Sequence, residues 1–206
     1  MKTHCMYVVM IAIVAMLAGC GGAIDKSQYV LDISPPLAAK VLQPPSATLE
    51  VRTFTITSEF SGRQMVYRID EFRYAPDYYH EFLIPPATMI TQATRNYLAD
   101  AGLFARVLEP GSGMTPTYLL SGSIVACYAD IRDKAAPAAV LCLRIFLTKQ
   151  EKGVETLVWN NAYQMRESMK NTQSPSFAAA MSRCLQTALQ ELKKDLAQQP
   201  VQLWQQ

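Results

Sequence analysis

The chain has 206 residues, of which 50% are hydrophobic and 17% are charged, and its formal net charge at pH 7 is +2. This length and hydrophobic content are typical of one globular domain with an ample core, and they exclude disorder for most of the chain. The near balance of charges gives no basic surface of the kind that binds nucleic acid. The longest apolar run lies within the first twenty residues, so we expect any attachment to a membrane to act at the N-terminus.

The first nineteen residues have the pattern of an export signal. Residues 1–4 are short and cationic, and residues 5–16 are apolar but too few to span a bilayer. The tetrapeptide that follows resembles the lipobox of bacterial lipoproteins, whose cysteine becomes the lipidated first residue: Leu17, Ala18, Gly19 and Cys20. We therefore predict a lipoprotein signal peptide over residues 1–19 and acylation of Cys20. The alternatives are an ordinary signal peptide with a chance cysteine, or an N-terminal core helix.

Acylation would determine where the protein is held. Three acyl chains on Cys20 bind a bilayer firmly, because each buried methylene contributes about 0.8 kcal/mol. Gly21 and Gly22 stand where an aspartate retains such proteins at the inner membrane of enteric bacteria. The resemblance to the lipobox therefore implies the periplasmic face of the outer membrane, with the lipid bilayer as a partner through Cys20.

The mature chain is expected to form a lipidated tether over residues 20–28, one domain over residues 29–199 and a tail over residues 200–206. Alternation of period two, with β-branched and aromatic residues, predicts strands at residues 29–33, 48–56, 65–69, 105–108, 118–131, 138–148 and 157–165. Apolar residues at helical spacing predict a helix from about Pro86 to Ala101, closed by Gly102. A final helix is expected to begin at Ser174 and to stop before Pro200.

The order of these elements indicates the fold class. Turns at residues 133–134 and 152–153 join consecutive long strands, which favours an antiparallel meander. Each helix has one apolar stripe. We therefore predict an α+β fold in which two helices pack on one face of a mixed, mainly antiparallel sheet.

Export places the remaining cysteines in an oxidising compartment. Once the signal is cleaved and Cys20 is acylated, the cysteines that remain are Cys127, Cys142 and Cys184. Cys127 and Cys142 lie at equal distances from the turn near residue 134, so an antiparallel hairpin could place them opposite each other for a disulfide. The alternative is two small buried residues that never form a bridge. The sequence leaves both open.

The residues offer little chemistry. After cleavage His80 is the sole histidine, so a two-histidine metal site cannot be built. The chain has neither a nucleophile elbow nor a phosphate-binding loop. We therefore predict no metal, no cofactor and no catalytic residues. The remaining catalytic alternative is an anchored hydrolase that uses His80 with a nearby carboxylate. We expect the acidic residues near His80 to lie on a solvated segment between strand and helix: Asp70, Glu71, Asp77 and Glu81.

Aromatic residues gather just before the double proline. Six lie within sixteen residues: Tyr67, Phe72, Tyr74, Tyr78, Tyr79 and Phe82. This density is typical either of a recognition surface or of a core under the first helix. Tyr78 and Tyr79 are the strongest candidates for contact with a partner, and Phe82 and Trp204 are further candidates. The apolar tail around Trp204 could dock on a partner or fold back on the domain.

Several of these features together resemble one family. The lipobox, the strand Met65–Arg68, the aromatic segment, the helix start at Pro85–Pro86 and the later residues Gly102–Phe104 are similar to the ABC-type transport auxiliary lipoproteins, the PqiC-like family. The likeness extends from about Tyr29 to Ala197. Phe82 stands where the family usually has a tryptophan.

The resemblance implies a non-enzymatic outer-membrane lipoprotein. Its partners would be an inner-membrane ABC permease and ATPase complex and an MCE-domain protein, which together move lipid or another hydrophobic compound across the periplasm. In this scheme Cys20 tethers the protein, the proline-rich crossing after the first strand gives reach, and the domain receives the far end of a conduit. The alternative is a lipoprotein that activates a cell-wall synthase or assembles an outer-membrane machine. The sequence leaves open whether the chain forms a homo-oligomer.

Overall fold

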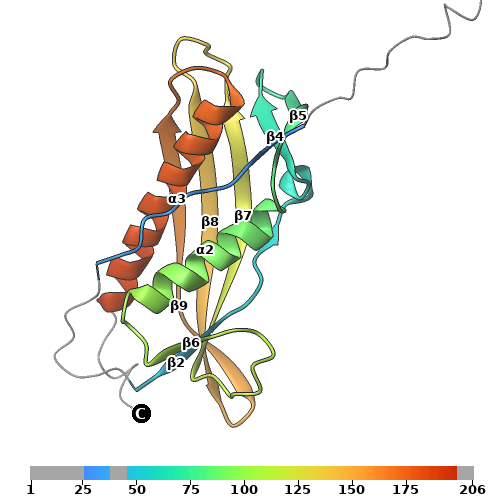
Figure 1. Cartoon of the computed structure of the whole chain (residues 1–206). Coiled ribbons are helices and arrows are strands. Elements are labelled where there is room, and N and C mark those ends of the chain that lie inside the picture. The colour runs from blue at the N-terminus through green and yellow to red at the C-terminus, as the bar shows by residue number, and fades with distance from the viewer. Residues whose placement is uncertain (1–25, 38–45, 199–206) are drawn as a thin grey trace, which may run out of the picture.

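A computed structural model describes residues 26–37 and 46–198 as two layers, a sheet and a pair of helices (Figure 1). Within those residues the sheet has nine strands. The elements in chain order are β1 (Ser27–Tyr29), β2 (Thr48–Val51), β3 (Thr55–Ile56), a 3-10 turn η1 (Ser58–Phe60), β4 (Gln64–Arg68), β5 (Tyr74–Phe82), α2 (Pro86–Asp100), β6 (Arg106–Leu108), β7 (Tyr118–Asp130), β8 (Ala138–Glu151), β9 (Val154–Ser168) and α3 (Ser174–Ala197).

The three longest strands form the predicted meander. β7 pairs antiparallel with β8, and β8 pairs antiparallel with β9. Lys152 and Gly153 close the second hairpin with φ values of 51° and 82°. Two consecutive positive φ angles match a two-residue type I′ turn, whose twist agrees with that of the strands it joins. The turn predicted at residues 152–153 is confirmed.

The short strands divide between the two ends of β7. β2 lies beside the first residues of β7 and also pairs with β6. β4 lies beside the last residues of β7, then β5 pairs with β4 and β1 with β5. We call these the β6 end and the β1 end of the domain. In Figure 1 they are the bottom and the top of the molecule.

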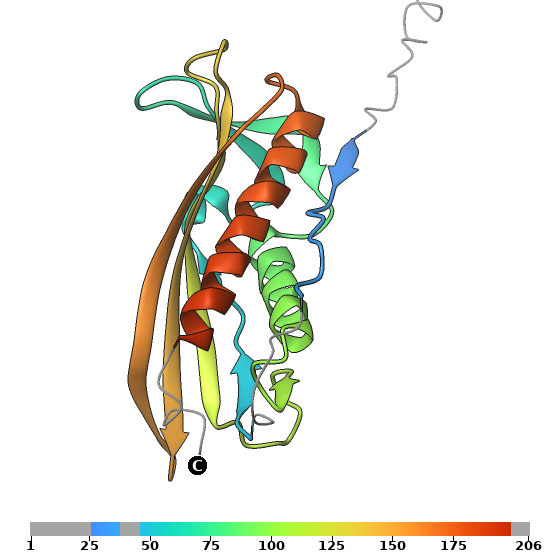
Figure 2. The same cartoon turned by 90° about the vertical axis from the view of Figure 1, so that its left-hand side faces the viewer.

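Both helices cover the same face of the sheet, and the other face is left without a helix (Figure 2). Apolar side chains of α3, among them Leu185, Leu189 and Leu192, are buried against inward-facing residues of the meander such as Leu141 and Leu143. The predicted α+β fold is therefore confirmed. Neither α2 nor α3 is apolar enough over a sufficient length to cross a bilayer.

Most of the segment that the sequence predicted to be solvated is the strand β5. Residues 74–82 pair on one side with β4 and on the other with β1, so the expected solvated segment is wrong for these residues. Asp70 and Glu71 are exposed outside the strands, as expected. The acidic residues Asp77 and Glu81 interrupt the apolar alternation, which hides the strand. Its polar side chains are tolerated because they have partners: Glu81 is ion-paired with Arg63, and Asp77 is hydrogen-bonded to His80 within the strand.

The cysteine pair does not meet. Cys127 lies opposite Leu141, while Cys142 lies opposite Ala126, so the two thiols are on different faces of the hairpin. Both cysteines are free, so of the two alternatives the structure shows the pair without a bridge. Asp130 lies opposite Ala138, so the hairpin is centred on Lys134 itself, and the two cysteines are one residue out of register. Burial raises the pKa of the Cys127 thiol to about 12, so it remains protonated at neutral pH.

A first prediction concerns the close packing of β7 against the segment between β2 and β3. A Cβ added at Gly122 would lie 2.8 Å from the buried ring of Phe54. We expect Gly122→Ala to lower the free energy of unfolding by about 1–3 kcal/mol, measured by urea denaturation. Gly62→Ala is the control, because the added methyl group there meets only the flexible side chain of Gln64. Equal stability of the two variants would contradict the packing.

A second prediction concerns the buried carboxylate of Asp130. Arg132 donates to its two oxygens over 2.9 and 2.8 Å, and Arg166 donates over 3.0 Å. These hydrogen bonds, those from Arg132 above all, hold the pKa of Asp130 well below its usual range. A depressed pKa stabilises the fold at pH values above the unfolded pKa near 4, and that contribution is lost as the pH falls further.

We therefore expect Asp130→Asn to lower the free energy of unfolding at pH 7 by about 1–2 kcal/mol, since solvent screens the exposed guanidinium groups. The difference between variant and wild type should shrink as the pH falls from about 5 toward 3. Unfolding curves across this range provide the measurement. A difference that stays constant with pH would show that the carboxylate charge is not responsible.

Candidate functional site

A large bulge in β5 shapes the surface at the β1 end. Gln64 of β4 pairs with Glu81, but Val66 pairs with Pro76, so residues 77–80 have no counterpart on β4. The carboxylate of Asp77 accepts the backbone N–H groups of Tyr79 at 2.8 Å and His80 at 3.1 Å. Asp77 thereby replaces the missing ladder partners. Bulges of this kind redirect side chains away from the regular alternation of a strand.

The bulge turns two tyrosines toward solvent. Tyr78 and Tyr79 are 60% and 53% exposed, and their rings meet edge to face with 5.4 Å between centroids. The Nζ atom of Lys26 lies 4.9 Å from the centre of the Tyr78 ring. These contacts fix an exposed pair of large, amphipathic rings beside a cation. We call Lys26, Tyr78 and Tyr79 the tyrosine surface.

The other two aromatic candidates differ from this pair. Phe82 is 1% exposed and packs edge to face on Phe177 of α3, so its predicted role in contact with a partner is wrong. The regular alternation resumes after the bulge and directs Phe82 into the core. Trp204 lies outside the described residues, and its role stays a prediction.

A chain of hydrogen bonds joins the bulge to the start of α3. His80 Nδ1 lies 2.9 Å from Asp77, the hydroxyl of Ser174 donates to Asp77 over 3.5 Å, and the hydroxyls of Tyr67 and Ser174 are 2.9 Å apart. Burial raises the pKa of Tyr67 to about 12, which keeps its hydroxyl protonated. Ser174 is the first residue of α3, so the chain fixes this helix to β4 and β5.

The same geometry bears on the hydrolase alternative. A serine nucleophile needs its hydroxyl hydrogen-bonded to the histidine that takes its proton. Here the hydroxyl of Ser174 is bonded to Tyr67 and Asp77 instead, and Ser174 is buried. Tyr67, Asp77, His80 and Ser174 line an open cavity of about 560 Å³, but their hydrogen bonds fix the start of α3. Among residues 26–37 and 46–198, no three His, Cys, Asp or Glu side chains lie together in a way that could bind a metal.

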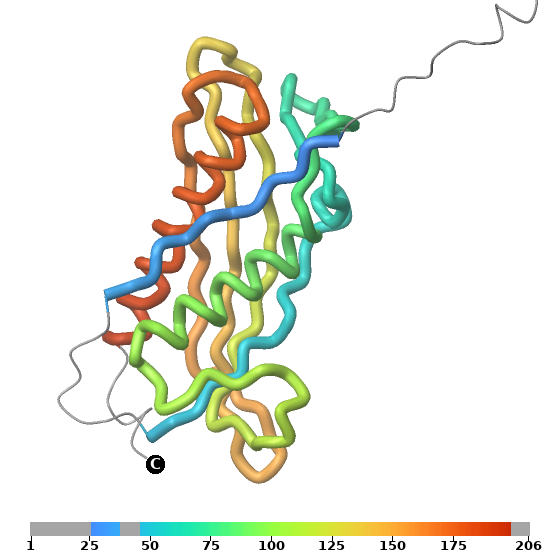
Figure 3. Tube along the Cα trace, viewed as in Figure 1, coloured from blue at the N-terminus to red at the C-terminus, as the bar shows by residue number. Residues whose placement is uncertain are grey.

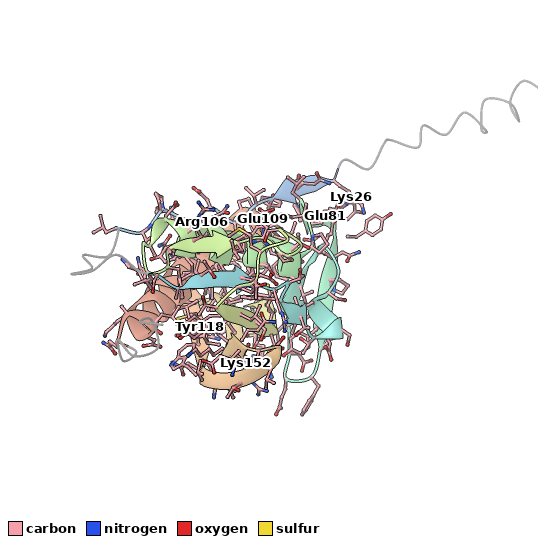
Figure 4. All side chains as sticks on the ribbon, turned by 90° about the horizontal axis from the view of Figure 1, so that it is seen from below. Lys26, Glu81, Arg106, Glu109, Tyr118 and Lys152 are labelled. Carbon is pink, nitrogen blue, oxygen red and sulfur yellow. The ribbon has the colours of Figure 1, made fainter. Side chains whose placement is uncertain are left out.

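Glu81 ties the first described strand to the sheet. This buried carboxylate is ion-paired with Arg63 of the segment before β4 and lies 3.9 Å from Lys26 (Figure 4). Gln28 of β1 donates to it over 3.1 Å. The two cations are partly exposed while the carboxylate is buried, so the charge presented outward here is positive. None of these partners was indicated by the sequence.

The proline-rich crossing lies on the domain. Residues 30–37 run over α2 and then α3 (Figure 3). The backbone N–H groups of Leu31, Asp32 and Ser34 donate to Met89, Ser182 and Gln186 over 3.3, 3.1 and 2.7 Å. The expectation that this crossing gives reach is therefore wrong for its first part. The second double proline, at residues 44–45, lies outside the described residues.

The β6 end carries a separate group of exposed apolar side chains. They come from the loop before β7 and from the start of β9: Met114, Val154 and Leu157. Charged residues lie at the same end, including Arg106, Glu109 and Lys152 (Figure 4). Sequence reasoning missed this surface. One residue could have indicated it. Val154 is apolar and directly follows a two-residue turn, where no helix is expected to cover it.

Solved structures with this fold confirm the architecture. The protein XCC0632 of Xanthomonas campestris aligns with a TM-score of 0.75 at 17% identity, over 85% of this chain and 99% of that chain. An uncharacterized protein aligns with a TM-score of 0.62 at 12% identity, over 84% and 99%. The hypothetical protein CT253 of Chlamydia trachomatis aligns with a TM-score of 0.50 at 8% identity, over 73% and 95%. At these identities the likeness shows the fold alone.

Sequence comparison is more specific. No functionally curated protein matches the chain. A family model does match, over residues 29–193, and that family is described as the ABC-type transport auxiliary lipoprotein component.

A third prediction tests the bulge. We expect Asp77→Ala to speed hydrogen exchange at the amides of Tyr79 and His80 at least tenfold, because both lose their acceptor, and to lower the free energy of unfolding by about 1–2 kcal/mol. Exchange read by NMR provides the measurement. Asp70→Ala, at an exposed position before β5, is the matched control and should change neither quantity. Unchanged exchange in Asp77→Ala would show that the carboxylate does not maintain the bulge.

Proposed function

Because this chain belongs to the family of ABC-type transport auxiliary lipoprotein components, we propose that it is the outer-membrane lipoprotein of a transport system that moves lipid or another hydrophobic compound. In this proposal an inner-membrane ABC transporter supplies the energy and an MCE-domain protein carries the compound across the periplasm. The family description names an auxiliary component and no catalytic activity. The task left to this chain is to hold a docking surface at a membrane.

Attachment is assigned to Cys20. Its lipobox-like context and the glycines that follow it support acylation and retention at the periplasmic face of the outer membrane. Cys20 lies outside the described residues, but Lys26, six residues later, is at the β1 end of the domain. The anchor therefore acts on that end.

The observation that carries the docking role is that one group of exposed apolar side chains, Met114, Val154 and Leu157, lies at the opposite end. β8 and β9 have 14 and 15 residues and run between the two ends. At about 3.3 Å per residue, such strands separate the ends by roughly 45–50 Å. Met114, Val154 and Leu157 are then directed away from the anchor, where a partner arriving from the periplasm would meet them. We assign the contact with the MCE-domain protein to this β6 end.

A fourth prediction tests this assignment by crosslinking in cells. A photoreactive amino acid at Val154 should capture the MCE-domain protein, whereas one at Gln164 should capture at least fivefold less. Gln164 is the matched control because it is also exposed on β9 but lies ten residues further along the strand, away from the β6 end. Capture is measured by mass spectrometry of the crosslinked band. A cell-wall synthase or an outer-membrane barrel captured at Val154 would replace the proposal with the assembly role.

The same strain can test the anchor. With Cys20→Ser, the protein should leave the membrane fraction, and capture at Val154 should fall several-fold because the tethered effective concentration is lost. A protein that is soluble yet fully supports transport would make the anchor irrelevant to function. Unchanged transport in His80→Ala, with normal folding, would also remove the hydrolase alternative.

A further inference from the structure

The tyrosine surface has features that the docking role does not use. Two large rings are held in solvent by a bulge, and Asp77 maintains that bulge with two backbone hydrogen bonds. Exposed aromatic rings gain nothing from the fold itself, because their apolar faces remain in water. An arrangement that keeps them exposed indicates a contact outside the domain.

Chain length limits where this surface can lie. Six residues join Cys20 to Lys26, and six residues span at most roughly 22 Å even when fully extended. Lys26 itself lies against the ring of Tyr78 and pairs with Glu81, so the tyrosine surface begins where the described chain begins. Residues 27–29 belong to β1 and residues 30–37 lie on the helices, so neither stretch can lengthen the connection without leaving the fold. An acylated Cys20 therefore keeps Tyr78 and Tyr79 close to a lipid leaflet.

The chemistry of the surface fits the boundary between lipid headgroups and acyl chains. Tyrosine is enriched at that depth because its ring is apolar and its hydroxyl can remain hydrated. Lys26 and Arg63 are partly exposed, whereas the carboxylates of Glu81 and Asp77 are mostly buried. The outward charge beside the rings is therefore positive, which suits the phosphate groups of lipids.

From these observations we infer that the tyrosine surface binds the lipid leaflet directly, as a second membrane contact beside the acyl anchor. The contact would seat the β1 end on the headgroups and direct the β6 end into the periplasm. This inference rests on the proposed acylation of Cys20, and it adds an orientation that an acyl anchor alone does not provide.

The test places a photoreactive amino acid at Tyr79 in the full acylated protein, reconstituted into vesicles of phosphatidylethanolamine and phosphatidylglycerol. The matched control is the same substitution at Leu157, which is 53% exposed like Tyr79 but lies at the β6 end. After irradiation, lipid adducts on each variant are counted by mass spectrometry. We expect at least fivefold more lipid adducts at position 79 than at position 157.

Three results would overturn the inference. They are equal lipid labelling at the two positions, crosslinks at position 79 to a second copy of this chain, and no adduct at position 79. The intact mass of each sample reports acylation separately. A protein that lacks acyl chains would contradict the proposed anchor. An acylated protein without lipid adducts at position 79 would contradict only this inference. Melting temperatures equal to that of the wild type confirm that both variants are folded.

A second variant tests the rings themselves. With the photoreactive group at position 79, Tyr78→Ser should reduce lipid adducts at least twofold, because the remaining tyrosine ring of the surface is removed. Tyr128→Ser is the control, since Tyr128 lies at the same end in a ring cluster with Phe60 and Tyr74, apart from the tyrosine surface. Equal labelling in the two variants would show that proximity alone, without binding, explains the adducts.

Discussion

Burial of the apolar stripe of α3 against the long meander is the contact on which the rest of the domain depends. Leu185, Leu189 and Leu192 lose nearly all of their exposure in this contact, and such burial is the main favourable term in folding. Once α3 lies along the meander, its first residue, Ser174, is placed beside Tyr67 and Asp77. The bulge and the tyrosines it exposes are thus positioned by a helix that begins almost a hundred residues later in the chain.

Much of this architecture could be predicted because apolar residues recur with a clear helical or strand period in most of its elements. The helix expected at residues 86–101 is α2, and Gly102 follows it with a φ of 69°, as a helix-ending glycine should. The three meander strands also lie where alternation indicated them. β5 was missed because its polar residues are satisfied by partners distant in the sequence. Cys127 and Cys142 are not bridged because the hairpin is centred on Lys134, which puts them one residue out of register, and the residues of the turn do not define its centre to within one residue.

The candidate site was predicted only in part for the same reason. Aromatic density alone indicated Tyr78 and Tyr79, and it also indicated Phe82, because composition does not report which way a side chain points. The direction depends on how β4 pairs with β5, which is a property of the folded sheet. The exposed residues of the β6 end form a group only because β7 and β9 bring Met114 and Leu157 to one end of the domain. A local sequence pattern does not show which strands pair when they are distant in the chain.

The parallel pairing of β1 with β5 has a mechanical consequence. A force applied at Lys26 along the strand direction loads the backbone hydrogen bonds between β1 and β5 at the same time, in shear. A force applied across the strand would break these hydrogen bonds one after another. Behind β1, the hydrogen bonds of residues 31–34 to α2 and α3 would bear the load next. A force applied to the chain before Lys26 would therefore be spread over one strand and two helices before it reached the core.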